Sequence, residues 1–215
     1  MRFIDRKDAG TQLASALQLT DTDNAVVVAL PRGGIPVGLE IAEKYHLPFD
    51  MVLSKKIGHP LHSEYAVGAV SEYGDPLLNT IVIDRLDQKW INKEISRLRK
   101  AMESRRKKYS QVLSPRSLKD KIVIIVDDGI ATGLTMKVAI EAVRKQEAKE
   151  IIVAVPIIPR DTYHELLDLV DQVVAVDVPE VFLGAVGAYY SHFPQVDDEE
   201  VIASLKSFSD PDQIE

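Results

Sequence analysis

Two adjacent carboxylates, Asp127 and Asp128, follow an apolar run in the segment Ile122 to Met136, which reads IVIIVDDGIATGLTM. The run predicts a buried strand, and the loop after the acids leads into a segment with helical spacing. Open α/β sheets bind ligands at this carboxyl edge, and free N–H groups at a helix start suit a phosphate. The acids would repel that phosphate in direct contact, so we expect them to accept hydrogen bonds from hydroxyl groups or to lie near a divalent cation. A sugar phosphate meets both demands.

A second strand, turn and helix are predicted between Val26 and Gly38. The turn contains Arg32, Gly33 and Gly34, which offer a guanidinium and backbone N–H groups to an anion. An ordinary tight turn is the alternative interpretation, because glycine serves turns of many kinds.

A polar stretch, Ser54 to Tyr65, follows the next predicted strand. Its adjacent lysines, Lys55 and Lys56, suit a strongly negative ligand. His59 and His62 lack a third ligand residue nearby, so the stretch does not predict a zinc site.

The segment with the acid pair resembles the motif by which type I phosphoribosyltransferases bind 5-phosphoribosyl-1-pyrophosphate (PRPP). The resemblance rests on the apolar run, the two acids, a short spacer and Thr-Gly-x-Thr. It implies that Asp127 and Asp128 hold the ribose 2′- and 3′-hydroxyls, with Mg²⁺ bound nearby through PRPP. It also implies that the following loop wraps the 5′-phosphate, with contributions from Gly129, Ala131, Thr132, Gly133, Leu134 and Thr135.

The same resemblance implies roles for the other two segments. The turn with Arg32, Gly33 and Gly34 would contact pyrophosphate and often contains a non-proline cis peptide in this family. The stretch Ser54 to Tyr65 would be a mobile loop that closes over the reacting centre, with Lys55 and Lys56 assisting Arg32 in catalysis. Closure would exclude water, which competes for the activated sugar.

Three features of the sequence bear on the acceptor. Ala131 stands where the hypoxanthine-guanine branch usually carries an aspartate. The segment 178–196 occupies the place of the family's variable hood, in which Phe182, Tyr189 and Tyr190 could stack on a ring. Packing within the hood is the alternative. Arg160 could reach the acceptor, or it could be a solvent-exposed residue at a helix start.

The elements expected around these residues alternate between strands and helices. Such an order predicts a doubly wound, mostly parallel, Rossmann-like α/β sheet flanked by helices in one domain over residues 1–215, with a small C-terminal hood. A charged helix inserted at 87–110 is either a solvated element or a subunit interface, which leaves a homo-oligomer open. Helices are predicted at Pro36–Tyr45, Thr135–Lys145 and Arg160–Val170, and strands at Ala25–Ala29, Met51–Leu53, Thr80–Ile83, Ile122–Val126, Ile151–Val155 and Val173–Val176.

The composition narrows the partners. The 215 residues carry a formal net charge of −7 and no cysteine, so we expect neither nucleic acid nor a membrane as a partner, and a cytoplasmic location. Neither a P-loop nor the dinucleotide-binding glycine pattern is present in the sequence.

Three possibilities for the function follow. The first is a PRPP-dependent glycosyltransferase that moves phosphoribose to a nucleobase-like nitrogen and releases pyrophosphate. The second is a regulatory protein that binds PRPP or a nucleotide without turnover. The third is a subunit-forming PRPP-binding protein in which the helix at 87–110 makes an interface.

Overall fold

The computed structural model of the chain describes residues 2–79, 82 and 86–208. Five parallel strands form its main sheet. Their order is β2-β1-β6-β7-β8, so the chain builds outward from β1 in one direction and from β6 in the other. The neighbouring strands β1 and β6 are buried along their whole length, as expected for apolar runs in a parallel sheet. The strands are β1 (Ala25–Ala29), β2 (Phe49–Met51), β6 (Ile122–Val126), β7 (Glu150–Ile157) and β8 (Gln172–Asp177).

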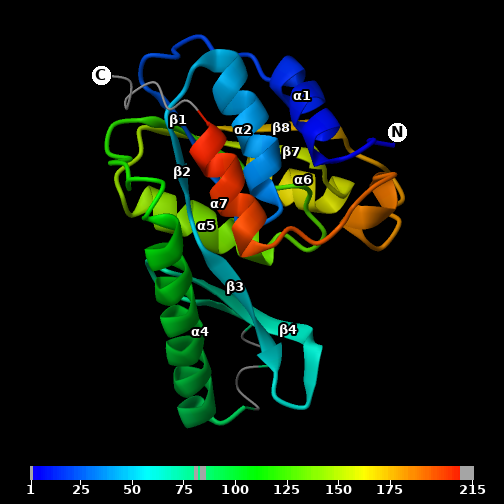
Figure 1. Cartoon of the computed structure of the whole chain (residues 1–215). Coiled ribbons are helices and arrows are strands. Elements are labelled where there is room, and N and C mark those ends of the chain that lie inside the picture. Colours follow the sequence, from blue (N-terminus) through cyan, green and yellow to red (C-terminus); the bar gives the residue numbers. More distant parts are fainter. Residues whose placement is uncertain (1, 80–81, 83–85, 209–215) are drawn as a thin grey trace.

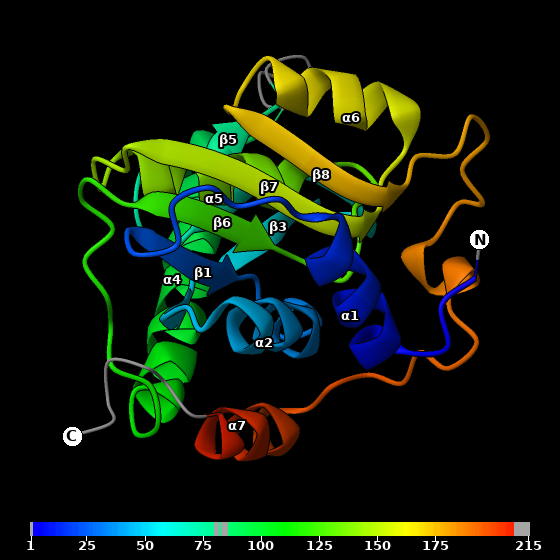
Figure 2. The same ribbon diagram turned by 90° about the horizontal axis from the view of Figure 1, so that it is seen from above.

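Helices cover both faces of this sheet (Figure 2). One face packs against α1 (Arg6–Ala16), α2 (Gly34–Tyr45) and α7 (Asp198–Ser207). The other face packs against α5 (Leu134–Arg144) and α6 (Arg160–Leu167). The predicted doubly wound α/β fold is therefore confirmed, and its topological switch point lies between β1 and β6, where such sheets bind ligands.

A long helix and a hairpin extend away from the main sheet (Figure 1). The hairpin belongs to a separate antiparallel sheet of β3 (Ser54–His59), β4 (His62–Ser71) and β5 (Leu77–Leu78), and the helix α4 spans Gln88–Tyr109. The predicted charged helix buries one apolar face, which includes Ile91, Leu98 and Met102. No described helix combines the length and apolar character that a membrane span requires.

The hood is built from two distant parts of the chain. Its 3₁₀ turn, Val186–Tyr189, is followed by Tyr190, which pairs with Phe3 of the N-terminal segment through an isolated parallel bridge. The Phe3 N–H donates to the Tyr189 carbonyl at 2.8 Å, and the Ser191 N–H donates to the Phe3 carbonyl at 2.7 Å. The N-terminal segment thereby fixes the hood beside the main sheet.

Some sequence predictions need correction. The stretch Ser54 to Tyr65 is not a loop, because β3 and the start of β4 occupy it, with Ile57 buried beneath α4. The strand predicted at Met51–Leu53 lies earlier, at Phe49–Met51, and the chain then turns toward the hairpin. The strand predicted at Thr80–Ile83 falls outside the described residues apart from Val82. The predicted helix Arg160–Val170 ends at Leu167.

Candidate active site

The acid pair lies at the carboxyl end of β6, directly beside the turn that follows β1. The Leu30 N–H donates to the Val126 carbonyl at 2.8 Å and holds the two segments together. The approach explains the paired glycines, because a Cβ added to Gly33 would lie 2.0 Å from Asp128 Oδ2. A Cβ added to Gly34 would lie 2.7 Å from the Val126 carbonyl oxygen. The structure therefore brings the predicted ribose-binding acids and the predicted pyrophosphate turn into one site.

Arg6, which no sequence motif predicted as a site residue, is the counterion of Asp128. Its Nε donates to Asp128 Oδ2 at 2.7 Å, and its Nη1 donates to the Pro194 carbonyl at 2.7 Å. The guanidinium also lies 3.7 Å from the centroid of the Phe193 ring, and only 10% of the side chain is exposed. Tyr190 completes this side, since its hydroxyl donates to the Asp128 carbonyl at 2.6 Å. A helix at the N-terminus and the hood thus both support the acid pair.

The acid pair carries more negative charge than its single arginine can balance. Burial raises the pKa of Asp127 well above its usual value, and the neighbouring charge of Asp128 raises it further. Burial also raises the pKa of Asp128, although the Arg6 guanidinium opposes that increase. One arginine therefore does not balance two carboxylates, and hydroxyl donors or a cation would stabilise their ionised forms.

The pair by itself offers a cation only part of a coordination shell. Among the described residues, no group of three or more acidic, histidine or cysteine side chains is arranged to hold a metal ion. Mg²⁺ prefers oxygen ligands in an octahedral shell and is often bound by one or two carboxylates together with substrate phosphates. The residues fit Mg²⁺ that enters with a phosphorylated ligand, and they do not form a complete metal site.

The loop after the acids presents backbone donors. Gly129 and Gly133 adopt positive φ angles of 151° and 72°, and Gly133 is the N-cap of α5. No N–H group of residues 131–136 donates a hydrogen bond to another described residue. These N–H groups lie at the start of α5 and in the loop before it, where the helix dipole also favours an anion. The predicted phosphate loop, which includes Ala131, Thr132, Leu134 and Thr135, therefore has the donors that a 5′-phosphate needs.

The turn after β1 has an unusual backbone, and one of its N–H groups is bonded within the turn. The peptide bond between Pro31 and Arg32 is cis, as the family resemblance implies. The Gly34 N–H donates to the Leu30 carbonyl at 3.0 Å, so it is occupied within the turn. The Arg32 side chain points toward the first turn of α7, where its Nη1 lies 3.8 Å from Asp198 Oδ1.

The two lysines of β3 differ in position. Lys55 is partly buried, and burial lowers its pKa, as do the nearby charges of Arg105 and Arg32. Lys56 is exposed, and successive side chains of a strand point to opposite faces. Lys55 is therefore within range of the Arg32 charge, whereas Lys56 lies on the exposed face of β3.

The residues considered for the acceptor pack against other parts of the chain. Phe182 and Tyr189 stack on each other, with ring centroids 5.4 Å apart. Tyr189 is buried, and its hydroxyl accepts a hydrogen bond from the Leu183 N–H at 3.0 Å. Arg160 donates from Nη1 to Glu180 at 2.9 Å. These contacts give Tyr189 a packing role and leave acceptor binding by the hood a prediction.

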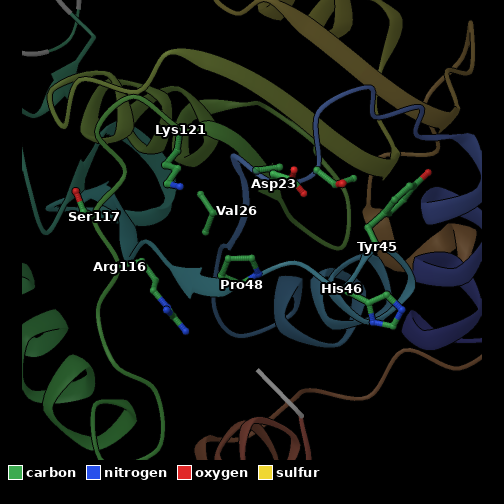
Figure 3. Close-up of a pocket in the computed structure, with 10 residues that line it drawn as sticks. Asp23, Val26, Tyr45, His46, Pro48, Arg116, Ser117 and Lys121 are labelled. Atoms are coloured by element: carbon green, nitrogen blue, oxygen red, sulfur yellow. The ribbon is translucent and has the colours of Figure 1, made fainter. Parts of the chain in front are cut away.

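A cavity of about 590 Å³ lies at the opposite edge of the main sheet (Figure 3). It opens at the amino ends of β1 and β6, and the close-up shows Tyr45 pointing away from its centre. No residue of the acid pair, the phosphate loop or the Arg32 turn lines it. The backbone N–H groups that suit a phosphate therefore lie at the other end of these strands, away from the cavity.

The family model of the phosphoribosyl transferase domain matches residues 5–190. This stretch contains the acid pair, the phosphate loop, the Arg32 turn and the hairpin. The chain therefore belongs to the phosphoribosyl transferase domain family, which confirms the resemblance seen in the sequence.

Individual relatives extend this result. Two curated proteins of Mycobacterium tuberculosis, from strains CDC 1551 / Oshkosh and ATCC 25618 / H37Rv, carry provisional names as phosphoribosyl transferases. Each is 38% identical over 209 residues, which cover 94% of this chain and 46% of the relative. The chain thus spans about half the length of the curated relatives it matches. The crystal structure of TT1426 from Thermus thermophilus is 38% identical, covers 97% of this chain and 100% of its own, and superimposes with a TM-score of 0.81.

Proposed function

We propose that the chain transfers 5-phosphoribose from PRPP to a nitrogen acceptor and releases pyrophosphate. The observation that carries the proposal is the meeting of three features at the switch point of the sheet. These are the under-neutralised acid pair, the loop of residues 131–136, whose N–H groups donate to no other described residue, and the turn with Arg32. A ligand with adjacent hydroxyls, a phosphate and a pyrophosphate matches all three.

The reaction is a substitution at C1 of the ribose. The bond between C1 and the pyrophosphate oxygen breaks, and its electron pair leaves with pyrophosphate. The nitrogen lone pair forms the new bond to C1 from the opposite face, and the displaced N–H proton passes to water. Positive charge that develops on the ribose is stabilised by the nearby carboxylates, and negative charge on the leaving group by Arg32 and Lys55.

Positioning supplies the rest of the catalysis. The phosphate loop would hold one end of PRPP and the acid pair its ribose, which fixes C1 relative to the acceptor. Asp127 and Asp128 would also be the protein carboxylates nearest Mg²⁺, which when bound with PRPP offsets the charge of the phosphates.

Turnover and binding without turnover are separated by one experiment. The protein is incubated with PRPP, Mg²⁺ and single nucleobases, and pyrophosphate release is measured against a sample without acceptor. We expect at least one base to accelerate release, and the Asp127→Asn, Asp128→Asn double variant to abolish the acceleration. PRPP binding without release for any acceptor would favour the regulatory alternative and contradict the proposed reaction.

A further inference from the structure

Cationic side chains from two elements, α4 and the turn after β1, surround a single carboxylate at the start of α7. Asp198 Oδ1 lies 3.3 Å from Arg105 Nε and 3.8 Å from Arg32 Nη1. Its Oδ2 lies 3.5 Å from Lys108 Nζ, and the Tyr109 hydroxyl donates to Oδ1 at 2.8 Å. Arg105 and Lys108 belong to α4, whereas Arg32 belongs to the turn after β1.

One carboxylate does not balance these charges. Lys55 lies close enough to be affected by Arg105, Arg32 and Asp198, and it makes no ion pair with another described residue. Burial would raise the pKa of Asp198, but the Tyr109 hydrogen bond and the charges of Arg105 and Lys108 bring it below its usual value. The carboxylate is therefore ionised at neutral pH, and the excess positive charge around it favours a more highly charged anion.

The helix that carries Arg105 is held in place independently of Asp198. The adjacent Arg106 donates from Nη1 to Asp50 at 3.1 Å and from Nε to Glu72 at 3.0 Å. This network ties α4 to the end of β4 and to the main sheet, and Arg106 is largely buried. Arg105 consequently stays at the site when its partner changes.

Asp198 attaches the start of α7 to α4, but it does not form the cap of α7. Asp197 is the N-cap, and a capping box joins it to Glu200. The Glu200 N–H donates to Asp197 at 2.8 Å, and the Asp197 N–H donates to Glu200 at 2.9 Å. The Asp198 side chain can therefore leave the cations without loss of the helix cap.

We propose that the cations around Asp198 bind the outer phosphate of pyrophosphate and that Arg105 contacts it, an inference that rests on the proposed function. The bound ligand replaces the Asp198 carboxylate. The carboxylate occupies the site in the ligand-free protein and keeps the cations together. Arg105 thereby joins Arg32 and Lys55 as a ligand-binding residue, and α7 becomes an element that responds to the ligand.

Calorimetric titration of the intact chain with magnesium pyrophosphate, without PRPP or acceptor, tests this proposal. Asp198→Asn removes the competing charge but keeps the side-chain shape, so we expect affinity to rise at least about threefold. Arg105→Gln removes a contact to the ligand, so we expect affinity to fall about tenfold. The matched controls are Asp75→Asn and Lys107→Gln, which make the same charge changes at exposed ion pairs. Both controls are expected to bind like the unaltered protein.

A second measurement separates ligand exchange from a merely structural role. We expect hydrogen exchange of the first turn of α7 to change on addition of pyrophosphate in the unaltered protein and not in Arg105→Gln. Thermal melting checks that each variant is folded, and Arg105→Lys, which keeps the charge, should retain part of the affinity. If Arg105→Gln fails to fold, Asp198→Asn and the exchange measurement still decide the question.

The proposal is overturned if both Asp198→Asn and Arg105→Gln bind pyrophosphate like their controls, or if α7 exchange is unaffected by the ligand. Turnover of PRPP with those results would leave the proposed reaction standing. If pyrophosphate binds as expected but no acceptor supports turnover, the anion site is upheld and the proposed reaction is contradicted.

Discussion

The two halves of the site each receive a counterion from a helix near one end of the chain, but in different ways. At the acidic half, Arg6 of α1 contacts Asp128 at 2.7 Å and is also held by Pro194 and Phe193. At the cationic half, Asp198 of α7 lies between cations at 3.3 to 3.8 Å. The first charge is enclosed by the hood, whereas the second lies on one turn of a surface helix.

This difference distinguishes a permanent contact from an exchangeable one. Removing Arg6 would leave a buried carboxylate without its partner, so this ion pair supports the fold. A ligand anion that displaces the Asp198 carboxylate leaves every cation with a partner, so this contact can respond to a ligand. The variants below test whether the two halves differ in this way.

The largest effect is expected from Arg6→Leu. The variant leaves Asp128 buried without a counterion and should lower the free energy of unfolding by about 3 kcal/mol. Chemical denaturation measures the change, with Arg97→Leu as the control because that arginine is largely exposed. Adding Asp128→Asn to Arg6→Leu should recover part of the loss. A loss no larger than that of the control would show that the Arg6 contact is not a structural one.

A smaller effect of opposite sign is expected from Asp127→Asn. Burial and the charge of Asp128 raise the folded-state pKa of Asp127, so its protonated form is favoured in the folded chain. The contribution of protonated Asp127 to stability is complete below its unfolded-state pKa and is lost as pH rises through its higher folded-state pKa. At neutral pH the neutral asparagine should therefore raise the free energy of unfolding, on the order of 1 kcal/mol.

Thermal melting of Asp127→Asn and the unaltered chain across pH measures this effect. The difference in stability should grow from acidic toward neutral pH and should be small in acid. Equal stability of the two proteins at neutral pH would contradict the electrostatic account of the acid pair.

The smallest effect is expected from the two lysines of the hairpin. Lys55→Gln should weaken PRPP binding by about fivefold, because Lys55 lies beside Arg32 and Arg105. Lys56→Gln removes the same charge from the exposed face of β3 and should change affinity by less than about twofold. Fluorescence or calorimetric titration compares the two. Equal losses would indicate that the hairpin rearranges when the ligand binds.

The parts of the site that lie close together in sequence could be predicted from it. Residues 122–136 contain the strand, both acids, the glycines and the start of α5, so their order fixes their geometry. The apolar runs of β1, β6 and β7 predicted buried parallel strands, and the alternating order predicted the doubly wound sheet. The Arg32 turn joined the same site because parallel strands end at a common edge.

Contacts between distant segments could not be predicted in this way. Arg6 lies 122 positions before Asp128, in a short polar helix whose packing depends on a close approach at Gly10. Arg105 and Asp198 likewise meet only because α4 and α7 reach the Arg32 turn from different parts of the chain. The sequence predicts a loop at Ser54 to Tyr65 because few side chains in this stretch are apolar, and the burial of Ile57 depends on α4.

The central claim is that the acid pair and the loop after it bind PRPP. Calorimetric titration of PRPP with Mg²⁺ into the unaltered chain and into the Asp127→Asn, Asp128→Asn double variant tests it most directly. Asparagine oxygens can still accept the Arg6 hydrogen bond, so the variant should remain folded, as far-UV dichroism and melting would verify. The account predicts clear binding by the unaltered chain and a loss of affinity of at least about tenfold in the folded variant. Equal affinity in the two proteins would contradict it.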